Sequence, residues 1–501
     1  MTSEQQRVVV IGGGLAGLRL AARLGGDVRV LGEEEHAPYN RVLLAEVLAG
    51  RYAPEVTALP APGPALRRGV RAVRIDRAER VVHCDDGSVE RYGTLVLATG
   101  SNPVLPPLRG LFEPEGRELP AGVHAFRTMD DCLALSAAVR PGVRAVVIGG
   151  GLLGVSAARA LAERGAQVVL TQQGERLMER QLDAEASELL SIHLSGLGVE
   201  IHTECRVRGL STAPLPGLRP GPRASNAGEA GIAQSTGSHV QADASRKPAP
   251  PAFEERGTPS GSRGRVRAEP GTPRRAAAPE AGPARVPGRH PGANPSQGPR
   301  RVTGVELADG YRLDADLVVL ACGVRPRTGL AQAAGLDVRK GILVDDRLRT
   351  SDPRIHAIGD CAEHTGRVYG LAGPALEQAE ALAGVLLGTG EGIPTGAASG
   401  YTGTHALTRL TLTGGGDRPL DLAAFGETTP LPGDDVVRLA DATRRTYRKV
   451  VIRGDRLVGG VLFGELSSVG ALARSWEDGA PLTDQHGPTD LHHLLTDDGG
   501  S

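Results

Sequence analysis

Two stretches of the chain share one pattern of apolar and polar positions. Residues 7–11 form a short apolar run, which is followed by a glycine-rich turn and then by apolar residues at helical spacing. The same order of strand, glycine turn and helix returns at 144–164, about 137 residues further along the chain. Continuous apolar runs predict strands buried on both faces, and the long period indicates two nucleotide-binding units and not a short solenoid.

Further patterns predict the remaining elements. Short apolar runs that predict strands lie at 28–31, 94–100, 167–170 and 355–361. A helix is expected over 374–387, and residues 301–323 are expected to form a β-meander whose partner strand lies near 199–207. After a glycine-rich segment at 388–400, the remainder predicts an α+β module with a hairpin at 446–465.

The periodicity stops between residues 211 and 300. This stretch holds 16 Pro and 13 Gly, with 13 Arg or Lys against 6 Asp or Glu. Such a composition predicts a disordered, mildly basic insert. A tolerated surface loop is the first interpretation, because the entropy of closing a loop grows slowly with its length. Binding of an acidic partner or surface is the alternative.

Composition limits the class of protein. Of 501 residues, 40% are hydrophobic and 23% charged, which excludes a wholly disordered chain. Lys and Arg number 57 against 58 Asp and Glu, so the charge gives no reason to expect nucleic acid as a partner. No apolar stretch reaches the roughly 18 residues that span a bilayer, and no signal peptide precedes the first strand. We therefore expect a cytoplasmic protein.

The cysteines are few and scattered. They are Cys84, Cys132, Cys205, Cys322 and Cys361. No two have the spacing of a C-x-x-C or C-x₄-C motif, so we expect neither a redox disulfide nor an iron–sulfur cluster, which needs about four ligands. Cys132 and Cys361 are predicted to be buried structural thiols, and no residue is assigned as a metal ligand or a catalytic group.

The first glycine loop (residues 12–17, GGGLAG) has the spacing of a dinucleotide-binding turn. Its first glycine allows a sharp bend, its third lets the backbone approach a diphosphate, and its last lets the helix pack closely on the strand. The diphosphate would lie at the positive end of the helix. Glu33, 21 residues after Gly12, is placed to accept hydrogen bonds from an adenosine ribose. The residues assigned to this site are Gly12, Gly14, Leu15, Ala16, Gly17 and Glu33.

The second glycine loop (residues 149–154, GGGLLG) repeats this spacing with Gly149, Gly151 and Gly154. The acidic residue is missing, and Gln172 takes its place after the following strand. A carboxylate there favours NAD and repels a 2′-phosphate, whereas an amide does neither strongly. Arg176 is either a partner for a 2′-phosphate or a surface residue. The choice between NADH and NADPH stays open, and the glycine at the sixth loop position favours NADH.

Two dinucleotide sites in one chain predict two dinucleotides. The simplest chemistry between them is hydride transfer from NAD(P)H to FAD. The run at 355–361 ends in Gly359-Asp360, and a carboxylate there can accept a hydrogen bond from the ribityl chain of a flavin. The helix that begins near Pro374 can point its N–H groups at the flavin pyrimidine ring.

Seven segments carry a resemblance to known proteins. They are PYNRVLLAEVLAG (38–50), LVLATGSNPVLPP (95–107), GVHAFRTMDDC (122–132), GGGLLG (149–154), ERLMERQLDAEAS (175–187), GVRPRTGLAQAAGL (323–336) and IGDCAEHTGRVYGLAGPALEQA (358–379). The chain resembles the two-dinucleotide-domain flavoprotein reductases, which include ferredoxin and rubredoxin reductases. It resembles most the FAD/NAD(P)H portion of the assimilatory nitrite reductase large subunit. The resemblance covers residues 7–210 and 301–465 and leaves the insert unmatched.

The resemblance implies an α/β fold like that of glutathione reductase, in which an NAD(P)H domain is inserted into an FAD domain and a C-terminal α+β domain faces the flavin. The implied boundaries are 1–126 and 323–398 for the FAD domain, 127–322 for the NAD(P)H domain with the disordered insert at 211–300, and 399–495 for the C-terminal domain. The residues that it places against FAD are Arg41, Thr99, Gly100, Arg127 and Asp360.

Two departures from the resembled proteins bear on activity. The nitrite reductase large subunit carries further domains with cysteines for iron–sulfur clusters and sirohaem. No cysteine follows Cys361 here, so we expect that this chain does not itself reduce nitrite. Many relatives carry a Glu near the flavin, two residues past the second glycine loop, where this chain has Ser156. The effect of that change on hydride transfer stays open.

The sequence therefore predicts an FAD-dependent NAD(P)H oxidoreductase that passes electrons to a separate redox protein. A nitrite or nitrate reductase component, a ferredoxin and a rubredoxin are the candidate acceptors. One alternative is an NAD(P)H oxidase or a quinone or dye reductase, although residues 41–46 lack the cysteine of peroxide-reducing relatives. The other alternative is a non-catalytic flavin-binding sensor or scaffold. Association into a homodimer is left open.

Overall fold

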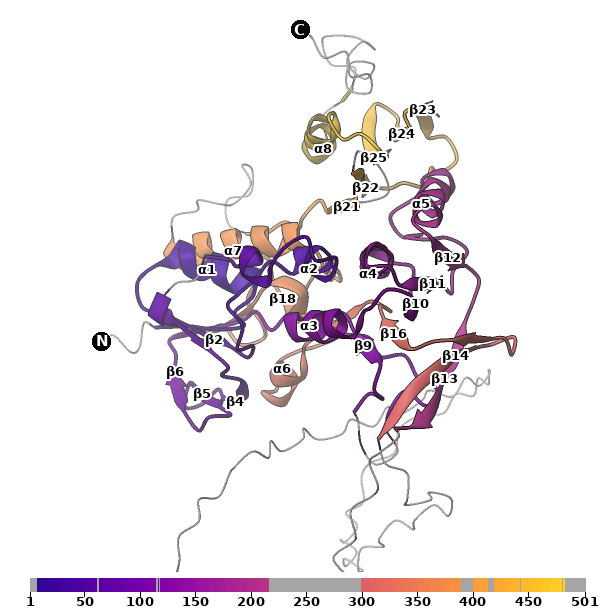
Figure 1. Ribbon diagram of the computed structural model, residues 1–501. Coiled ribbons are helices and arrows are strands. Elements are labelled where there is room, and N and C mark those ends of the chain that lie inside the picture. Colours follow the sequence, from indigo (N-terminus) through magenta and orange to yellow (C-terminus); the bar gives the residue numbers. More distant parts are fainter. Residues whose placement is uncertain are drawn as a thin grey trace, which may run out of the picture. The chain divides into compact units, whose positions relative to one another are not determined.

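The computed structural model describes residues 7–60, 63–113, 116, 118–215, 299–388, 400–412, 419–441, 443–479 and 481–482. Figure 1 shows the order of the described elements along the chain. Most of the insert predicted at 211–300, and with it the prediction of disorder, lies outside the described residues. Within the described part of the chain, no helix is both long enough and apolar enough to cross a membrane.

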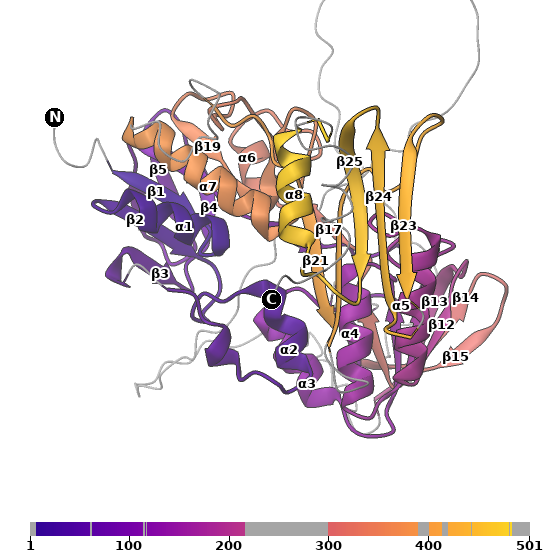
Figure 2. The same ribbon diagram turned by 90° about the horizontal axis from the view of Figure 1, so that it is seen from above.

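A parallel sheet, called the first sheet below, forms around the first apolar run. Its five strands in spatial order are β19 (Ile355–Ala357), β7 (Thr94–Leu97), β1 (Val8–Ile11), β2 (Val28–Gly32) and β3 (Leu66–Arg68). Helices α1 (Leu15–Leu24) and α7 (Ala372–Leu387) lie side by side, as Figures 1 and 2 show. Their apolar residues pack with Val10 and Val30 of the sheet. The predicted strand, glycine turn and helix are therefore present here.

A second parallel sheet, called the second sheet, forms around the repeat of that pattern. Its strands in spatial order are β12 (Val199–His202), β11 (Gln167–Thr171), β10 (Arg144–Ile148), β16 (Leu317–Leu320) and β9 (Val123–Ala125). Its helices are α3 (Met129–Ala138), α4 (Leu152–Glu163) and α5 (Ala184–Gly196). Strand β10 and helix α4 flank the second glycine loop, as the pattern of 144–164 predicts.

The predicted β-meander at 301–323 is wrong in its last strand. β14 (Arg300–Leu307) pairs antiparallel with β15 (Arg312–Asp314), but β16 leaves them and joins the second sheet in parallel with β10. All four residues of β16 are buried, as is usual for a parallel strand covered on both faces. The partner of β14 is β13 (Val207–Pro214), so the strand lies later than the predicted 199–207 and enters the range assigned to the insert.

Smaller elements connect these sheets. An antiparallel sheet is formed by β4 (Ala72–Asp76), β5 (Val81–Cys84) and β6 (Val89–Arg91). Two strand pairs are β8 (Ser101–Pro103) with β17 (Val324–Pro326), and β18 (Ile342–Val344) with β20 (Ala362–His364). The short helices are α2 (Leu44–Leu48) and α6 (Gly329–Ala333), and the 3₁₀ turns are Arg41–Leu43, Pro54–Thr57, Gly63–Ala65 and Gly359–Cys361.

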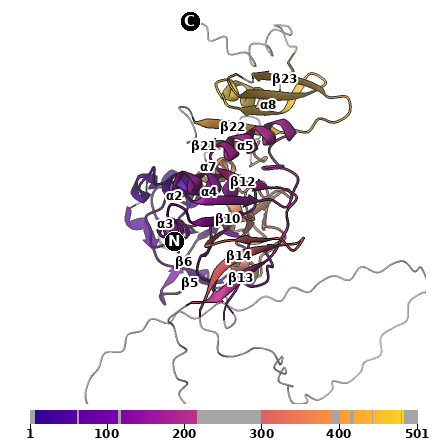
Figure 3. The ribbon, with the colours of Figure 1, turned by 45° about the vertical axis from the view of Figure 1, so that its right-hand side comes forward.

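The C-terminal module, residues 400–479, is the predicted α+β unit. Its antiparallel sheet has the order β21 (Leu407–Leu412), β22 (Leu420–Gly426), β25 (Arg456–Phe463), β24 (Thr446–Arg453) and β23 (Asp435–Asp441). Helix α8 (Val469–Asp478) lies against this sheet, as Figure 3 shows, and Leu472 packs with Phe425 and Leu462. The hairpin predicted at 446–465 is formed by β24 and β25.

A buried ion pair ties the C-terminal module to helix α5. Asp183 caps the N-terminus of α5 and accepts a hydrogen bond from the backbone N–H of Ala186. The same carboxylate accepts from the Tyr447 hydroxyl at 2.6 Å and from Lys449 Nζ at 2.9 Å. The side chain of Lys449 is 4% exposed and that of Asp183 is 12% exposed. Burial acts to raise the pKa of Asp183, but the hydrogen bonds from Tyr447 and Lys449 outweigh it and hold the pKa below its usual value.

We expect Asp183→Asn to lower the free energy of unfolding by about 3 kcal/mol at pH 7, because Lys449 would keep its buried charge and lose its counter-charge. The pKa of Asp183 is lowered on folding, so its contribution is complete above the usual carboxyl pKa and is lost as the pH falls through the folded-state value. Urea unfolding at pH 7 and at acidic pH measures both effects.

The pair Arg438–Glu185 supplies the matched control, because it joins the same two elements at 3.2 Å but is about half exposed. Arg438→Gln should cost less than about 1 kcal/mol at either pH. Equal losses for Asp183→Asn and Arg438→Gln would contradict the account of the buried pair.

Candidate dinucleotide sites

The first glycine loop joins β1 to α1. Gly12 has φ +123°, and a Cβ there would overlap the carbonyl oxygen of Ala98 at the end of β7. A Cβ on Gly17 would overlap the carbonyl oxygen of Gly12, so the helix packs closely on the loop. A Cβ on Gly14, the residue that precedes α1, would have no atom within 4 Å. The loop is therefore closed on its protein side and open where a ligand would approach.

The structure brings the first glycine loop beside the other two segments predicted to contact FAD. In the first sheet β7 lies between β1 and β19. Strand β7 ends just before Thr99-Gly100, and β19 ends just before Gly359-Asp360. Helix α1 begins at Leu15, and a Cβ built on Gly359 would lie 3.3 Å from the side chain of Ala16. The three segments meet because carboxyl ends of parallel strands share one edge of a sheet, where ligands bind in open α/β sheets.

A small polar cluster lies at this edge. Arg127 Nη2 donates to Asp360 Oδ2 and to Ser101 Oγ, each at 2.7 Å, and Ser101 Oγ donates to Asp360 Oδ2 at 2.8 Å. The side chains of Arg127 and Asp360 are 16% and 15% exposed. Burial lowers the pKa of Arg127, although Asp360 acts in the opposite direction. Sequence reasoning missed Ser101, whose only signal is its place directly after Thr99-Gly100.

Arg41 lies beside this cluster. Its Nη1 donates to the backbone carbonyl of Arg127 at 3.0 Å, and its Nη2 pairs with Glu34. Glu34 also accepts from the Tyr39 hydroxyl at 2.6 Å. The structure thus brings Arg41, Arg127 and Asp360 together, and their contact with FAD stays a prediction.

Glu33 has a protein partner that the sequence did not indicate. Arg327 Nη2 lies 2.6 Å from Glu33 Oε2, and both side chains are about 40% exposed. The backbone of Arg327 holds the neighbouring segment, because its N–H donates to Gly100 and its carbonyl accepts from Thr99 Oγ1 at 2.7 Å. Arg327 belongs to the GVRPRTG segment, and nothing in the sequence places that segment against Glu33.

The second glycine loop repeats the geometry of the first. Gly149 has φ +112°, and a Cβ there would lie against the carbonyl oxygen of Ala321 at the end of β16. A Cβ on Gly154 would overlap the carbonyl oxygen of Gly149, whereas a Cβ on Gly151 would have no atom within 4 Å. This loop is likewise open only on its ligand side.

The residues near the second loop carry no carboxylate at the ribose position. Gln172 Oε1 accepts a hydrogen bond from the N–H of Gly150 at 2.8 Å, so its amide N–H₂ group is the remaining donor. Arg176 has a buried Nε with no hydrogen-bond partner among the described residues. Ser156 is buried, and its hydroxyl donates to the carbonyl of Leu152 at 2.8 Å, within its own helix.

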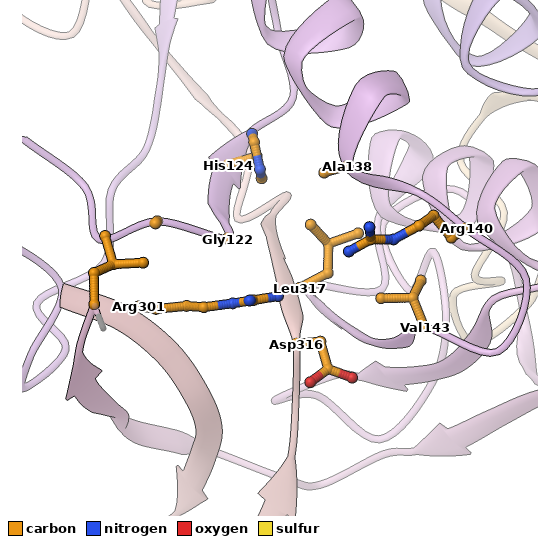
Figure 4. Close-up of a pocket in the computed structure, with 10 residues that line it drawn as sticks. Gly122, His124, Ala138, Arg140, Val143, Arg301, Asp316 and Leu317 are labelled. Atoms are coloured by element: carbon orange, nitrogen blue, oxygen red, sulfur yellow. The ribbon is translucent and has the colours of Figure 1, made fainter. Parts of the chain in front are cut away.

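A pocket of about 190 Å³ lies at the opposite edge of the second sheet (Figure 4). It is lined by His124, Arg140, Arg301 and Asp316 among others. Strands β9 and β16 begin at this pocket, whereas the second glycine loop follows the carboxyl end of β10. The pocket is therefore not part of the dinucleotide site.

Two observations test whether the residues at the first sheet fit FAD. Gly14 leaves open space directly before α1, as a diphosphate requires. Arg127 Nε is buried and has no hydrogen-bond partner among the described residues, so a donor is left over for a ligand. The residues present therefore fit this cofactor. No group of three or more His, Cys, Asp or Glu side chains that could hold a metal ion is found within the described ranges.

Comparison with known proteins decides the family. The model of the pyridine nucleotide-disulphide oxidoreductases matches residues 6–215 and 290–379, which is more than half of the chain. The chain belongs to this family. A second model, the rubredoxin NAD⁺ reductase C-terminal domain, matches residues 419–479 of the C-terminal module. As the sequence predicts, the chain is thus placed in a family of oxidoreductases whose members bind FAD and use NAD(P)H.

Individual relatives agree with this placement. The chain is 28% identical to nitrite reductase [NAD(P)H] of Bacillus subtilis (strain 168) over 92% of its own length and 46% of the relative. It is 29% identical to the probable ferredoxin reductase CtmF of Castellaniella defragrans over 77% of its length and 76% of the relative. The chain thus spans about half the length of the nitrite reductase relatives.

A solved structure shows the same fold. The crystal structure of the covalent putidaredoxin reductase–putidaredoxin complex aligns with a TM-score of 0.67 and 23% identity, over 98% of both chains. The predicted α/β fold, with two Rossmann-like domains and a C-terminal α+β domain, is confirmed by these comparisons.

Proposed function

We propose that this chain takes electrons from NAD(P)H, passes them through FAD, and delivers them to a separate redox protein. The observation that carries the proposal is the pair of glycine loops, each open at the carboxyl edge of its own parallel sheet. Bound FAD would supply the conversion between a two-electron donor and one-electron acceptors. The named candidates for the acceptor are a nitrite or nitrate reductase component, a ferredoxin and a rubredoxin.

The chain's own residues support an external acceptor. All five cysteines lie within the described residues and are free, so no internal disulfide is available to receive electrons. Cys132 and Cys361 are fully buried, and burial raises the pKa of each thiol, which disfavours the reactive thiolate. The match of the C-terminal module to the rubredoxin reductase domain supports an acceptor that docks from outside.

The assignment of residues follows from this proposal. Gly12, Gly14, Leu15, Ala16 and Gly17 would hold the FAD diphosphate, with Glu33 at the adenosine ribose. Arg127 and Asp360 would hold the ribityl region, with Arg41, Thr99 and Gly100 nearby. Gly149, Gly151, Gly154 and Gln172 would hold NAD(P)H. The domain boundaries implied by the resemblance, and a cytoplasmic location, are part of the same proposal.

Turnover with different acceptors tests the proposal. The purified, FAD-loaded chain is given NADH or NADPH together with oxygen alone, with a ferredoxin, or with a rubredoxin. We expect an iron–sulfur protein to increase NAD(P)H consumption at least tenfold over oxygen alone. Equal rates with and without the protein acceptor would favour an oxidase. No turnover with any protein acceptor or with a dye would favour a sensor or scaffold.

The nucleotide preference is expected to depend on Gln172. Glutamate at this position can still accept the hydrogen bond from Gly150, and it adds a charge that repels a 2′-phosphate. We expect Gln172→Glu to lower kcat/KM for NADPH by about tenfold, which is 1.4 kcal/mol, with little change for NADH. Gln173→Glu adds the same charge at an exposed neighbouring position and serves as the control. An equal fall with both nucleotides would contradict this role.

A further inference from the structure

A ring of four alternating charges lies where α2 meets α4. Arg159 on α4 pairs with Glu46 on α2, with 2.6 Å between Nη2 and Oε1, and with Glu163 one turn further along α4 at 3.2 Å. Arg51, just after α2, closes the ring: its Nε lies 2.6 Å from Glu46 Oε2 and its Nη1 pairs with Glu163. Each acid contacts both arginines, and the two positive charges balance the two negative charges.

The ring is strongly desolvated. The side chain of Arg159 is 1% exposed, and those of Glu46 and Glu163 are 15% and 16% exposed. Burial raises the pKa of Glu163, although Arg51 acts in the opposite direction. Transferring a charge from water into such a site is unfavourable unless a partner compensates. The two helices are therefore held in one arrangement, in which every charge meets its partners.

The ring joins two segments that are adjacent in sequence to the two predicted cofactor sites. Glu46 lies on α2, five residues after Arg41, whose Nη1 donates to the backbone carbonyl of Arg127 in the polar cluster at the first sheet. Arg159 lies five residues after Gly154, on the helix that follows the second glycine loop. The pairs Glu46–Arg159 and Arg51–Glu163 thus each connect a segment of the FAD site to the helix of the NAD(P)H site.

We propose that Glu46 and Arg159 are positioning residues for hydride transfer: their ion pair fixes the second glycine loop relative to the flavin-binding segment. Neither residue is proposed to contact the reacting atoms. The inference rests on the proposed function, since it assigns the ring a role in bringing nicotinamide and flavin together. A displacement of about 1 Å at a reacting centre can slow a reaction by about 100-fold, so a link between the two sites has a kinetic effect beyond stability.

The test uses Glu46→Gln, which keeps the size of the side chain and removes its charge. The FAD-loaded protein is mixed anaerobically with saturating NAD(P)H, and the rate constant of flavin reduction is measured by stopped-flow. We expect this rate constant to fall by about 10- to 100-fold, while the dissociation constant of FAD stays within about threefold of the wild type. Arg159→Lys keeps the charge but loses one of the two contacts with the acids. Its rate constant of flavin reduction should lie between those of the wild type and of Glu46→Gln.

A control separates positioning from stability. Arg77, which follows β4, and Asp352, which precedes β19, form an ion pair at 2.8 Å, and neither residue belongs to α2 or α4. Arg77→Gln should lower the melting temperature, although by less than Glu46→Gln because Arg77 is 37% exposed, and it should leave the rate constant unchanged. Should Glu46→Gln not fold, Glu46→Asp, which retracts the carboxylate by one methylene, carries the same kinetic test.

The outcomes are distinct from those of the proposed function. If the wild-type flavin is not reduced by either nucleotide, the proposed function fails. If the wild type is reduced and Glu46→Gln is reduced at the wild-type rate, the ring is only structural and the inference is wrong. A slow variant whose flavin, once reduced by dithionite, still passes electrons to the acceptor at the wild-type rate supports the inference.

Discussion

We expect the Gly14→Val variant to be isolated as a folded, colourless protein. Gly14 has an extended backbone, with φ −86° and ψ −170°, and a Cβ there would meet no atom of the chain within 4 Å. The change should therefore leave the melting temperature of the FAD-free protein within a few degrees of the wild type. The added side chain would occupy the space that a diphosphate needs at the N-terminus of α1. The dissociation constant of FAD should rise at least about 100-fold, or 2.7 kcal/mol.

Fluorescence titration of the apoprotein with FAD measures this effect. Gly12→Val supplies the contrast, because its Cβ would overlap the carbonyl oxygen of Ala98 and should impair folding itself. Wild-type FAD affinity in Gly14→Val would contradict the assignment of the first glycine loop.

The equivalent change in the second glycine loop, Gly151→Val, is expected to give a yellow protein that NAD(P)H reduces poorly. Gly151 has nearly the same backbone as Gly14, with φ −82° and ψ −175°, and an equally open Cβ position. FAD should bind normally, and kcat/KM for NAD(P)H should fall about 100-fold, because this loop would no longer accept a diphosphate. Steady-state kinetics with a dye acceptor measures the loss.

Reduction of the same variant by dithionite, which needs no nucleotide site, is the control. If Gly151→Val loses FAD while Gly14→Val keeps it, the two loops have been assigned to the wrong cofactors.

The sequence pattern predicted those parts of the fold that depend on residues close together in the chain. Strands β1 and β10, the loops after them and the helices α1 and α4 follow from continuous apolar runs, from glycine spacing and from helical periodicity within about thirty residues. The hairpin of β24 and β25 is likewise a short-range structure. The destination of β16 could not be predicted this way, because its choice between β15 and β10 depends on residues far apart in the sequence.

In the candidate site, too, some residues could be predicted from the sequence and others could not. The glycines and Asp360 could be found because each follows an apolar strand, and parallel strands bring their carboxyl ends together. Ser101, Arg327 and Glu46 could not be found, since each acquires its partner through tertiary packing: Asp360 with Ser101, Glu33 with Arg327, and Arg159 with Glu46. A lone arginine or glutamate has no spacing that indicates its partner.

Anaerobic titration of the FAD-loaded protein with NADH and with NADPH shows whether the nucleotide bound at one glycine loop reduces the flavin bound at the other. We expect the visible absorbance of the flavin to bleach with about one equivalent of at least one nucleotide, because two electrons reduce one flavin. The account would be contradicted by a protein that takes up no FAD, or by a bound flavin whose absorbance neither nucleotide changes.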